Sequence, residues 1–124
     1  MREIKFRAWD RARQIMADVT YINFEANIVR YSYRDGSTVI SSKQVELMQY
    51  TGLKDVNGVE IYEEDIVIRI YSLSSKASLV KYMNSGARFT ANRVSMYQPD
   101  GRRNYQIIGN KFENPKLLEV RDEL

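Results

Sequence analysis

Hydrophobic and polar residues alternate along much of the chain, which is the pattern of β-strands that bury one face. Near the start, Ile4, Phe6 and Ala8 alternate with charged residues, and residues 29–33 repeat the period of two. The alternation therefore predicts a strand in each of these segments. Further strands are predicted at residues 37–40, 53–56, 59–62, 66–71, 79–83, 87–91 and 105–108.

Turn sequences separate these predicted strands. The dipeptides Asp35-Gly36 and Asn57-Gly58 readily adopt the positive φ angles of tight hairpins. Residues 84–86 form a further turn between two strands, and residues 98–101 place a proline at the second position of a turn. Hairpins joined in this way pair antiparallel strands.

The end of the chain departs from the strand pattern. Asn114 offers a capping side chain, Pro115 suits the first helical position, and residues 116–119 are expected to form one or two helical turns. We therefore predict a mainly β protein of the β-rich α+β class. It is expected to be a small twisted barrel or sandwich of short antiparallel strands with a short C-terminal helical turn. No repeat or linker divides the 124 residues, which predicts a single domain spanning 1–124.

Cysteine and histidine are both absent. The lack of cysteine excludes disulfides, thiol nucleophiles and thiolate zinc sites. The lack of histidine excludes a Ser-His-Asp triad and the zinc sites of zincins and deaminases, because no imidazole is present. Catalysis would have to rest on carboxylates, lysine, tyrosine or carboxylate-bound Mg²⁺. The sequence identifies no catalytic, metal-binding or cofactor-binding residue.

No apolar run approaches the roughly 20 residues that span a bilayer. The first ten residues are charged from position 2 and lack the apolar core of a signal peptide. We therefore expect a cytoplasmic protein without a membrane partner.

The charges are unevenly distributed along the chain. Residues 46–65 hold six acids against one lysine, a balance of −5, whereas residues 69–112 hold eight bases against one aspartate, a balance of +7. The net charge is only +3. The sequence therefore predicts a dipolar protein more than a uniformly basic one.

Three blocks of sequence carry a family resemblance. They are MREIKFRAWD at 1–10, LMQYTGLKDVNG at 47–58 with its continuation to Val67, and IGN with FENP and LLE within 108–119. In this order and spread, the blocks resemble the YopX family. The resemblance implies a β-rich protein encoded by a bacteriophage or prophage and made in a bacterial host cell. It implies no activity and no catalytic residue, because the family is functionally uncharacterised.

Glu64 departs from the family pattern, which usually has glycine at this position. Two explanations are open: the turn does not need a positive φ angle, or Glu64 tolerates the strain of one. The fold itself is not in question.

The acidic residues near this position also have two interpretations. Glu60, Glu63, Glu64 and Asp65 could form a Mg²⁺ site or an acid–base pair. Alternation along a strand, however, sends adjacent carboxylates to different faces, so solvated turn charge is the simpler interpretation. Asp65 precedes a buried strand, where its carboxylate could cap backbone amides.

The basic stretch is the candidate binding surface. Cations that neutralise phosphates, interleaved with aromatic rings on which bases stack, are typical of β-sheet proteins that bind single strands. Alternatively, the rings point into the core and the charges are an ordinary solvated face. The candidate residues are Arg69, Lys81, Arg88, Arg93, Arg102, Arg103, Tyr97 and Tyr105.

Three hypotheses of function follow, in order of preference. The first is a non-enzymatic binding module, alone or as a homo-oligomer, that acts on a host or phage protein, since Tyr and Arg are common in protein contacts. The second is a nucleic-acid-binding protein that uses residues 69–112. The third is a carboxylate-dependent metal enzyme.

Overall fold

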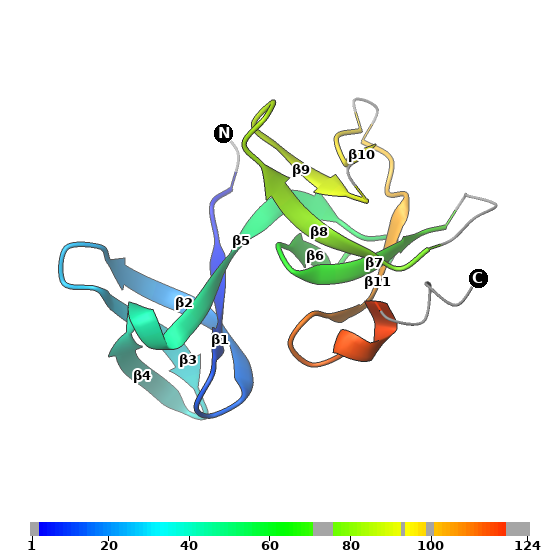
Figure 1. Ribbon diagram of the computed structural model, residues 1–124. Helices are drawn as coiled ribbons and strands as arrows, with labels where there is room; N and C mark the ends of the chain where they lie inside the picture. The colour runs from blue at the N-terminus through cyan, green and yellow to red at the C-terminus, as the bar shows by residue number, and fades with distance from the viewer. Residues whose placement is uncertain (1–2, 71–75, 93, 99–100, 119–124) are drawn as a thin grey trace. The chain divides into compact units, whose positions relative to one another are not determined.

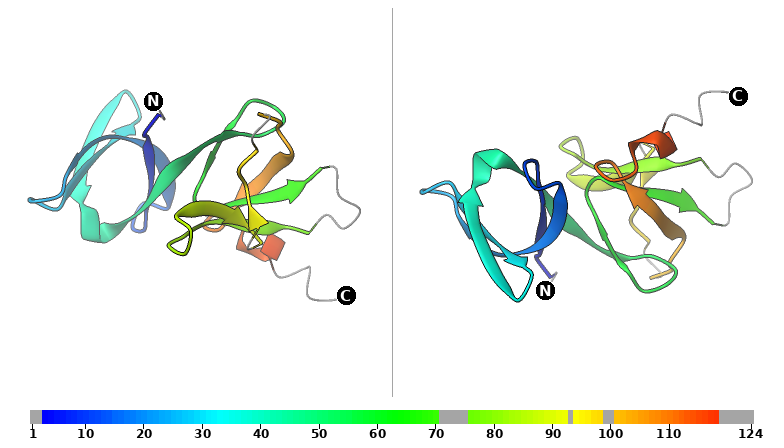
Figure 2. Two further views of the ribbon diagram at one scale, coloured as in Figure 1. Left: turned by 90° about the horizontal axis from the view of Figure 1, so that it is seen from above. Right: turned by 90° about the horizontal axis from the view of Figure 1, so that it is seen from below.

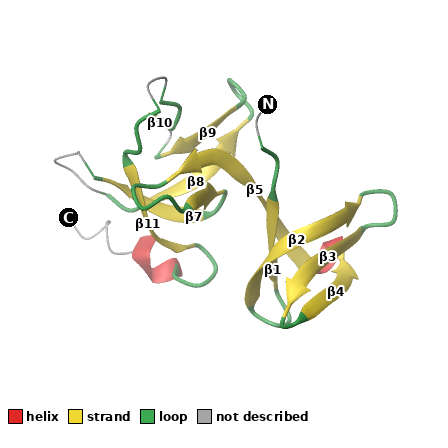
Figure 3. Ribbon diagram, turned by 180° about the vertical axis from the view of Figure 1, so that it is seen from behind, coloured by secondary structure: helices red, strands yellow, loops and turns green. Residues whose placement is uncertain are grey.

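The computed structural model describes residues 3–70, 76–92, 94–98 and 101–118. This part of the chain contains eleven strands and two short 3-10 helices, which confirms the mainly β prediction (Figures 1 and 3). In the same part, no helix has the length and apolar character needed to cross a bilayer. The strands are β1 (Phe6–Asp10), β2 (Ile15–Asn23), β3 (Ile28–Tyr33), β4 (Gly36–Ser41), β5 (Val45–Lys54), β6 (Glu60–Tyr62), β7 (Asp65–Arg69), β8 (Ser78–Met83), β9 (Arg88–Ala91), β10 (Val94–Ser95) and β11 (Tyr105–Asn110), and the helices are η1 (Ser42–Gln44) and η2 (Pro115–Leu118).

The chain divides into two compact units, Met1–Tyr50 and Thr51–Leu124. Strand β5 crosses the boundary, so it contributes residues to both units. The two units are therefore continuous through one strand, without a linker. That residues 1–124 form a single domain stays a prediction.

The first unit is an antiparallel sheet in the order β4-β3-β2-β1-β5. Its strands curve around a shared centre (Figure 2). The core of this unit consists of the buried Ala8, Val29 and Val45, with the partly buried Val19, Ile40 and Leu47 packed against them.

The predicted hairpin of β3 and β4 is confirmed, and its alternation is clear. Val29 and Tyr31 are fully buried, whereas the residues between and after them are exposed. The positive φ angle of the turn lies on Arg34 (+54°), not on Gly36, which is the first residue of β4. The glycine thus serves as an uncrowded strand residue, and the turn is one position earlier than the Asp-Gly dipeptide suggested.

The second unit contains the five-stranded sheet β10-β9-β8-β7-β11, and β6 pairs with β5. The hairpins predicted at Asn57-Gly58 and at residues 84–86 are both present. Helix η2 confirms the C-terminal helical turn, while Tyr71 of the strand predicted at 66–71, part of the turn predicted at 98–101, and Glu119 lie outside the described residues. The core of this unit consists of Ile61, Val67, Val80, Phe89, Ala91, Met96 and Tyr105, with Leu53 and Ile107 packed against it.

Four elements were missed in whole or in large part: β2, β10, η1, and residues 45–52 of β5, since the strand predicted at 53–56 covers only the last two residues of β5. Strand β2 is nine residues long, but most of its residues are only partly buried and Asp18 interrupts its apolar pattern. Strand β10 has only two residues. Neither β2 nor β10 presents the regular period of two that identifies a strand without its neighbours.

Because β5 belongs to both units, we expect them to unfold together. Trp9 is the chain's only tryptophan and lies buried in the first unit, whereas Val80 is fully buried in the second. Val80→Ala should remove roughly 2 kcal/mol of stability. In urea, the unfolding midpoint reported by Trp9 fluorescence should therefore be lower in this variant. It should also coincide with the midpoint at which the amide resonances of the second unit disappear. A Trp9 midpoint that stays at the wild-type value would show two independent domains.

Candidate ligand-binding groove

Asp55 is a structural carboxylate. Its side chain is 1% exposed and its Oδ1 accepts hydrogen bonds from the amides of Asn57 (2.9 Å) and Val59 (3.0 Å). Its Oδ2 accepts from the amide of Ile107 at 3.2 Å, where the pairing of β11 with β7 shifts register. One carboxylate thus ties a turn to a strand 52 residues away in sequence.

Asp65 has a similar role in the next turn. It is buried, and its Oδ2 accepts a hydrogen bond from the amide of Tyr62 at 2.8 Å. The predicted capping of a backbone amide is confirmed.

Glu64, beside it, has a φ angle of +69°. Of the two explanations offered by the sequence, the strained residue is therefore the correct one, at a cost of about 1 kcal/mol. The Glu64 carboxylate lies 2.5 Å from the Lys81 ammonium and 3.4 Å from that of Lys111.

The interpretation as solvated turn charge is wrong for Asp65, which is buried at the start of β7, and for Glu64, whose largely covered side chain pairs with two lysines. In the described ranges, no three acidic side chains come together in a way that could hold a metal ion. The arrangement gives the metal-enzyme hypothesis no support from geometry.

A third buried carboxylate, Asp10, organises the first unit. Its Oδ1 accepts from the amides of Ala12 (3.0 Å) and Arg13 (3.1 Å). Its Oδ2 accepts from the Tyr31 hydroxyl at 2.6 Å and from Nη1 of Arg13 at 3.0 Å. Burial raises the pKa of Asp10, but these hydrogen bonds together outweigh it, so its pKa lies below the ordinary value of 3.8. Burial, and then the bond to Asp10, raise the pKa of Tyr31.

This network makes the stability of the protein depend on acid. Because the folded-state pKa of Asp10 is depressed, the ionised group stabilises the fold above pH 3.8, and this contribution is lost as the pH falls through the lower folded pKa. Asp10→Asn should cost about 2 kcal/mol at neutral pH and flatten the pH dependence of the unfolding free energy below about pH 4. The exposed Asp18→Asn is the control. An acid dependence equal in Asp10→Asn and wild type would contradict this role.

The structure brings some of the predicted basic residues together: the pairs Met83–Arg88 and Lys81–Thr90 put Arg88 and Lys81 on one face of the β8–β9 ladder. Tyr105 is 6% exposed and belongs to the core, whereas Tyr97 is 71% exposed. Arg88 begins β9, and Arg102 and Arg103 precede β11. Nη1 of Arg103 lies 3.6 Å from where a Cβ would sit on Gly58. Arg93 lies outside the described residues.

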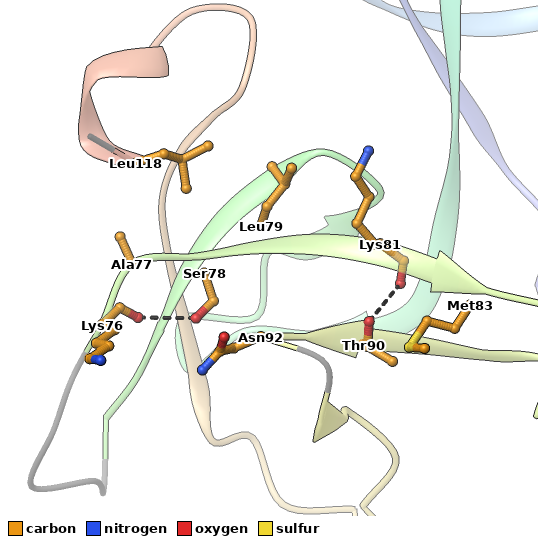
Figure 4. Close-up of a pocket in the computed structure, with 9 residues that line it drawn as sticks. All are labelled: Lys76, Ala77, Ser78, Leu79, Lys81, Met83, Thr90, Asn92 and Leu118. Atoms are coloured by element: carbon orange, nitrogen blue, oxygen red, sulfur yellow. Dashed lines mark hydrogen bonds between the residues drawn. The ribbon is translucent and has the colours of Figure 1, made fainter. Parts of the chain in front are cut away.

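Two of the predicted residues, Arg69 and Lys81, line hollows in the second unit. Lys81 is paired with Thr90 across the β8–β9 ladder, so side-chain alternation puts Leu79, Lys81, Thr90 and Asn92 on one face. That face forms an open groove of about 420 Å³. Figure 4 shows its lining: Lys76, Ala77, Ser78, Leu79, Lys81, Met83, Thr90, Asn92 and Leu118.

A smaller hollow of about 250 Å³ adjoins the groove and includes Arg69. The two hollows share Lys76, Ser78 and Asn92. Lys76 and Arg69 are both exposed. Two cations therefore lie at the end of the sheet where the hollows meet.

The groove combines apolar and cationic chemistry. Leu79, Met83 and Leu118 supply apolar surface, and Lys76 and Lys81 supply positive charge at its rim. The Lys81 ammonium is held by Glu64. Such a lining suits a ligand that carries an apolar group next to an anionic one.

Sequence reasoning missed Lys76 and Leu118 as lining residues. Lys76 contributed only to the charge balance of residues 69–112, and Leu118 only to the helical turn. The sole signal in the sequence was a cation directly before a predicted strand, which does not reveal what packs beside it.

Comparisons with known proteins agree on one family. The sequence profile of a family described as YopX protein matches residues 5–119. The crystal structure of protein EF1440 from Enterococcus faecalis is 28% identical, with a TM-score of 0.69 over 95% of this chain and 99% of that one. The crystal structure of protein yopX from Bacillus subtilis is 19% identical, with a TM-score of 0.62 over 92% of this chain and 95% of that one, and so shares the fold. None of the curated proteins matches.

Proposed function

The chain belongs to the YopX protein family, and we propose that it is a phage- or prophage-encoded accessory protein that works by binding, without catalysis, in the cytoplasm of a bacterial host. Its ligand is a host or phage protein. The resemblance found in the sequence supports the phage origin. The observation that carries the binding role is the groove lined by β8, β9 and η2.

The groove favours one kind of protein ligand. Its volume of about 420 Å³ is within the range of small-ligand sites and accommodates more than one side chain. Leu79, Met83 and Leu118 can cover an apolar side chain, while the exposed Lys76 can pair with a carboxylate. We therefore assign the ligand as a protein segment with an apolar residue next to Asp or Glu.

The hydrogen bonds and ion pairs of the carboxylates support a binding function over a catalytic one. Asp10, Asp55 and Asp65 each direct at least one oxygen to a backbone amide, and Glu64 lies between two lysines. Acids used in this way hold turns in place. A general acid or base needs an oxygen directed at the substrate.

Nucleic acid remains the second candidate, because Arg69 and Lys76 line adjoining hollows and could contact phosphates. The stacking part of that hypothesis depends on Tyr97, because Tyr105 lines the smaller hollow but is only 6% exposed. Phosphate contacts alone would give binding without base stacking. The protein ligand therefore fits the lining better.

Selection of peptides from a random display library against the purified protein tests the proposal. The enriched peptides should pair an apolar residue with Asp or Glu, and Lys76→Glu should weaken their binding about tenfold, the effect of roughly 1.4 kcal/mol. Lys54→Glu is the matched control, an exposed lysine of the same unit that does not line the groove. Peptides without acidic residues, or equal losses in both variants, would overturn the proposal.

A labelled single-stranded oligonucleotide gives the competing result in the same assay. Steeply salt-dependent binding that Arg69→Ala with Lys76→Ala removes would replace the protein ligand with nucleic acid. The pair Arg102→Ala with Arg103→Ala, singled out from the sequence, tests the other basic segment.

A further inference from the structure

The edge of β4 lacks the features that normally protect an exposed strand. Strand β4 is the last strand of its sheet, and β3 is its one partner in the described part of the chain (Figure 1). Its sequence, GSTVIS, has no charge and no proline, and its register with β3 runs without a bulge. Natural proteins usually block such edges with lysine, proline or bulges, because an open edge templates further pairing.

The hydrogen-bonding direction of β4 follows from its neighbours. Val39 lies opposite Arg30, whose carbonyl accepts a bond from the Thr20 hydroxyl on β2 at 3.3 Å. Because the Arg30 carbonyl faces β2, Arg30 and Val39 do not exchange main-chain hydrogen bonds. Three residues after Val39, the amide of Ser42 donates to the carbonyl of Asn27 at 2.9 Å, which fits the alternation of bonded and non-bonded pairs in an antiparallel ladder. By alternation, the main-chain groups of Ser37, Val39 and Ser41 face away from β3.

We propose that a second copy of this chain pairs with β4, antiparallel, about a twofold axis at Val39. In this register Val39 lies opposite its own copy, and Ser37 lies opposite Ser41 of the partner subunit. The outward amide and carbonyl groups of each strand then complete a ladder with the other. The exposed Val39 side chains, 56% exposed in the single chain, meet at the axis.

Charge complementarity selects a copy of the same chain and this register. Asp35 lies directly before β4 and Lys43 shortly after it. Antiparallel pairing centred on Val39 brings each Asp35 next to Lys43 of the partner subunit. Moving the axis by one residue, to Thr38 or Ile40, puts the two charges two positions out of line, and moving it to Ser37 or Ser41 puts them four positions out of line. A chain with an acid and a base at equal distances from the axis is complementary to itself.

The dimer should be weak and reversible, because one pair of six-residue strands buries less surface than the roughly 1,200 Å² of stable interfaces. The β4 edge lies in the first unit, whereas the groove belongs to the second. A negative result for the dimer therefore leaves the proposed binding groove unaffected, and the reverse also holds.

Sedimentation velocity over a range of protein concentrations tests the dimer. The mass should rise from that of one 14.5 kDa chain toward twice that value. Val39→Lys should abolish the rise, because two ammonium groups would meet at the axis, while Val59→Lys, at a valine that is 53% exposed in the other unit, should not. Circular dichroism confirms that both variants are folded.

Reversing the charges of Asp35 and Lys43, which flank β4, tests the proposed register of the two paired strands. Asp35→Lys and Lys43→Asp should each weaken the dimer about tenfold, and the double variant should restore it. Amide exchange at Val39 should slow as the concentration rises. A wild-type protein that stays monomeric, or a dimer that survives Val39→Lys, would overturn the proposal.

Discussion

The structure depends on buried carboxylates that accept hydrogen bonds from backbone amides. Asp55 is the strongest case, because its two oxygens hold three amides, one of them on β11. Each of these hydrogen bonds is partly buried, and a hydrogen bond to a charged group contributes roughly 1.5–3 kcal/mol. Asp10 and Asp65 do the same at the turns after β1 and before β7. A β protein with no cysteine, and therefore no disulfide to hold its turns, uses aspartates for this purpose.

The same constraint shapes the groove. Asp65 fixes the turn between β6 and β7, which places Glu64 in a left-handed conformation against β8. The Glu64 carboxylate then holds Lys81 at the rim of the groove. The strain at Glu64 is thus offset by contacts with two lysines, and it positions a charged residue of the candidate site.

Sequence patterns predict those features of the fold that residues close together in the chain determine. The alternation of β3, the turns at 57–58 and 84–86, and the cap by Asp65 all follow from neighbouring residues. Long-range packing decides the rest. Tyr105 is buried because β11 lies beside β7, and Lys76 meets Leu118 in the groove only through the folded sheet. The long-range bonds of Asp10 and Asp55 likewise left no mark that a sequence pattern could reveal.

The central claim is that these acids are structural, and the amide of Ile107 tests it most directly. By alternation along β11, this amide faces the same way as the carbonyl of Tyr105, which accepts from Val56, so it points away from β7 and toward Asp55. In native-state hydrogen exchange, the account predicts that this amide is as protected as its ladder neighbours in the wild type. In Asp55→Ala, which removes both accepting oxygens, it should lose that protection. Rapid exchange at Ile107 in the wild type, or unchanged protection in the variant, would contradict the account.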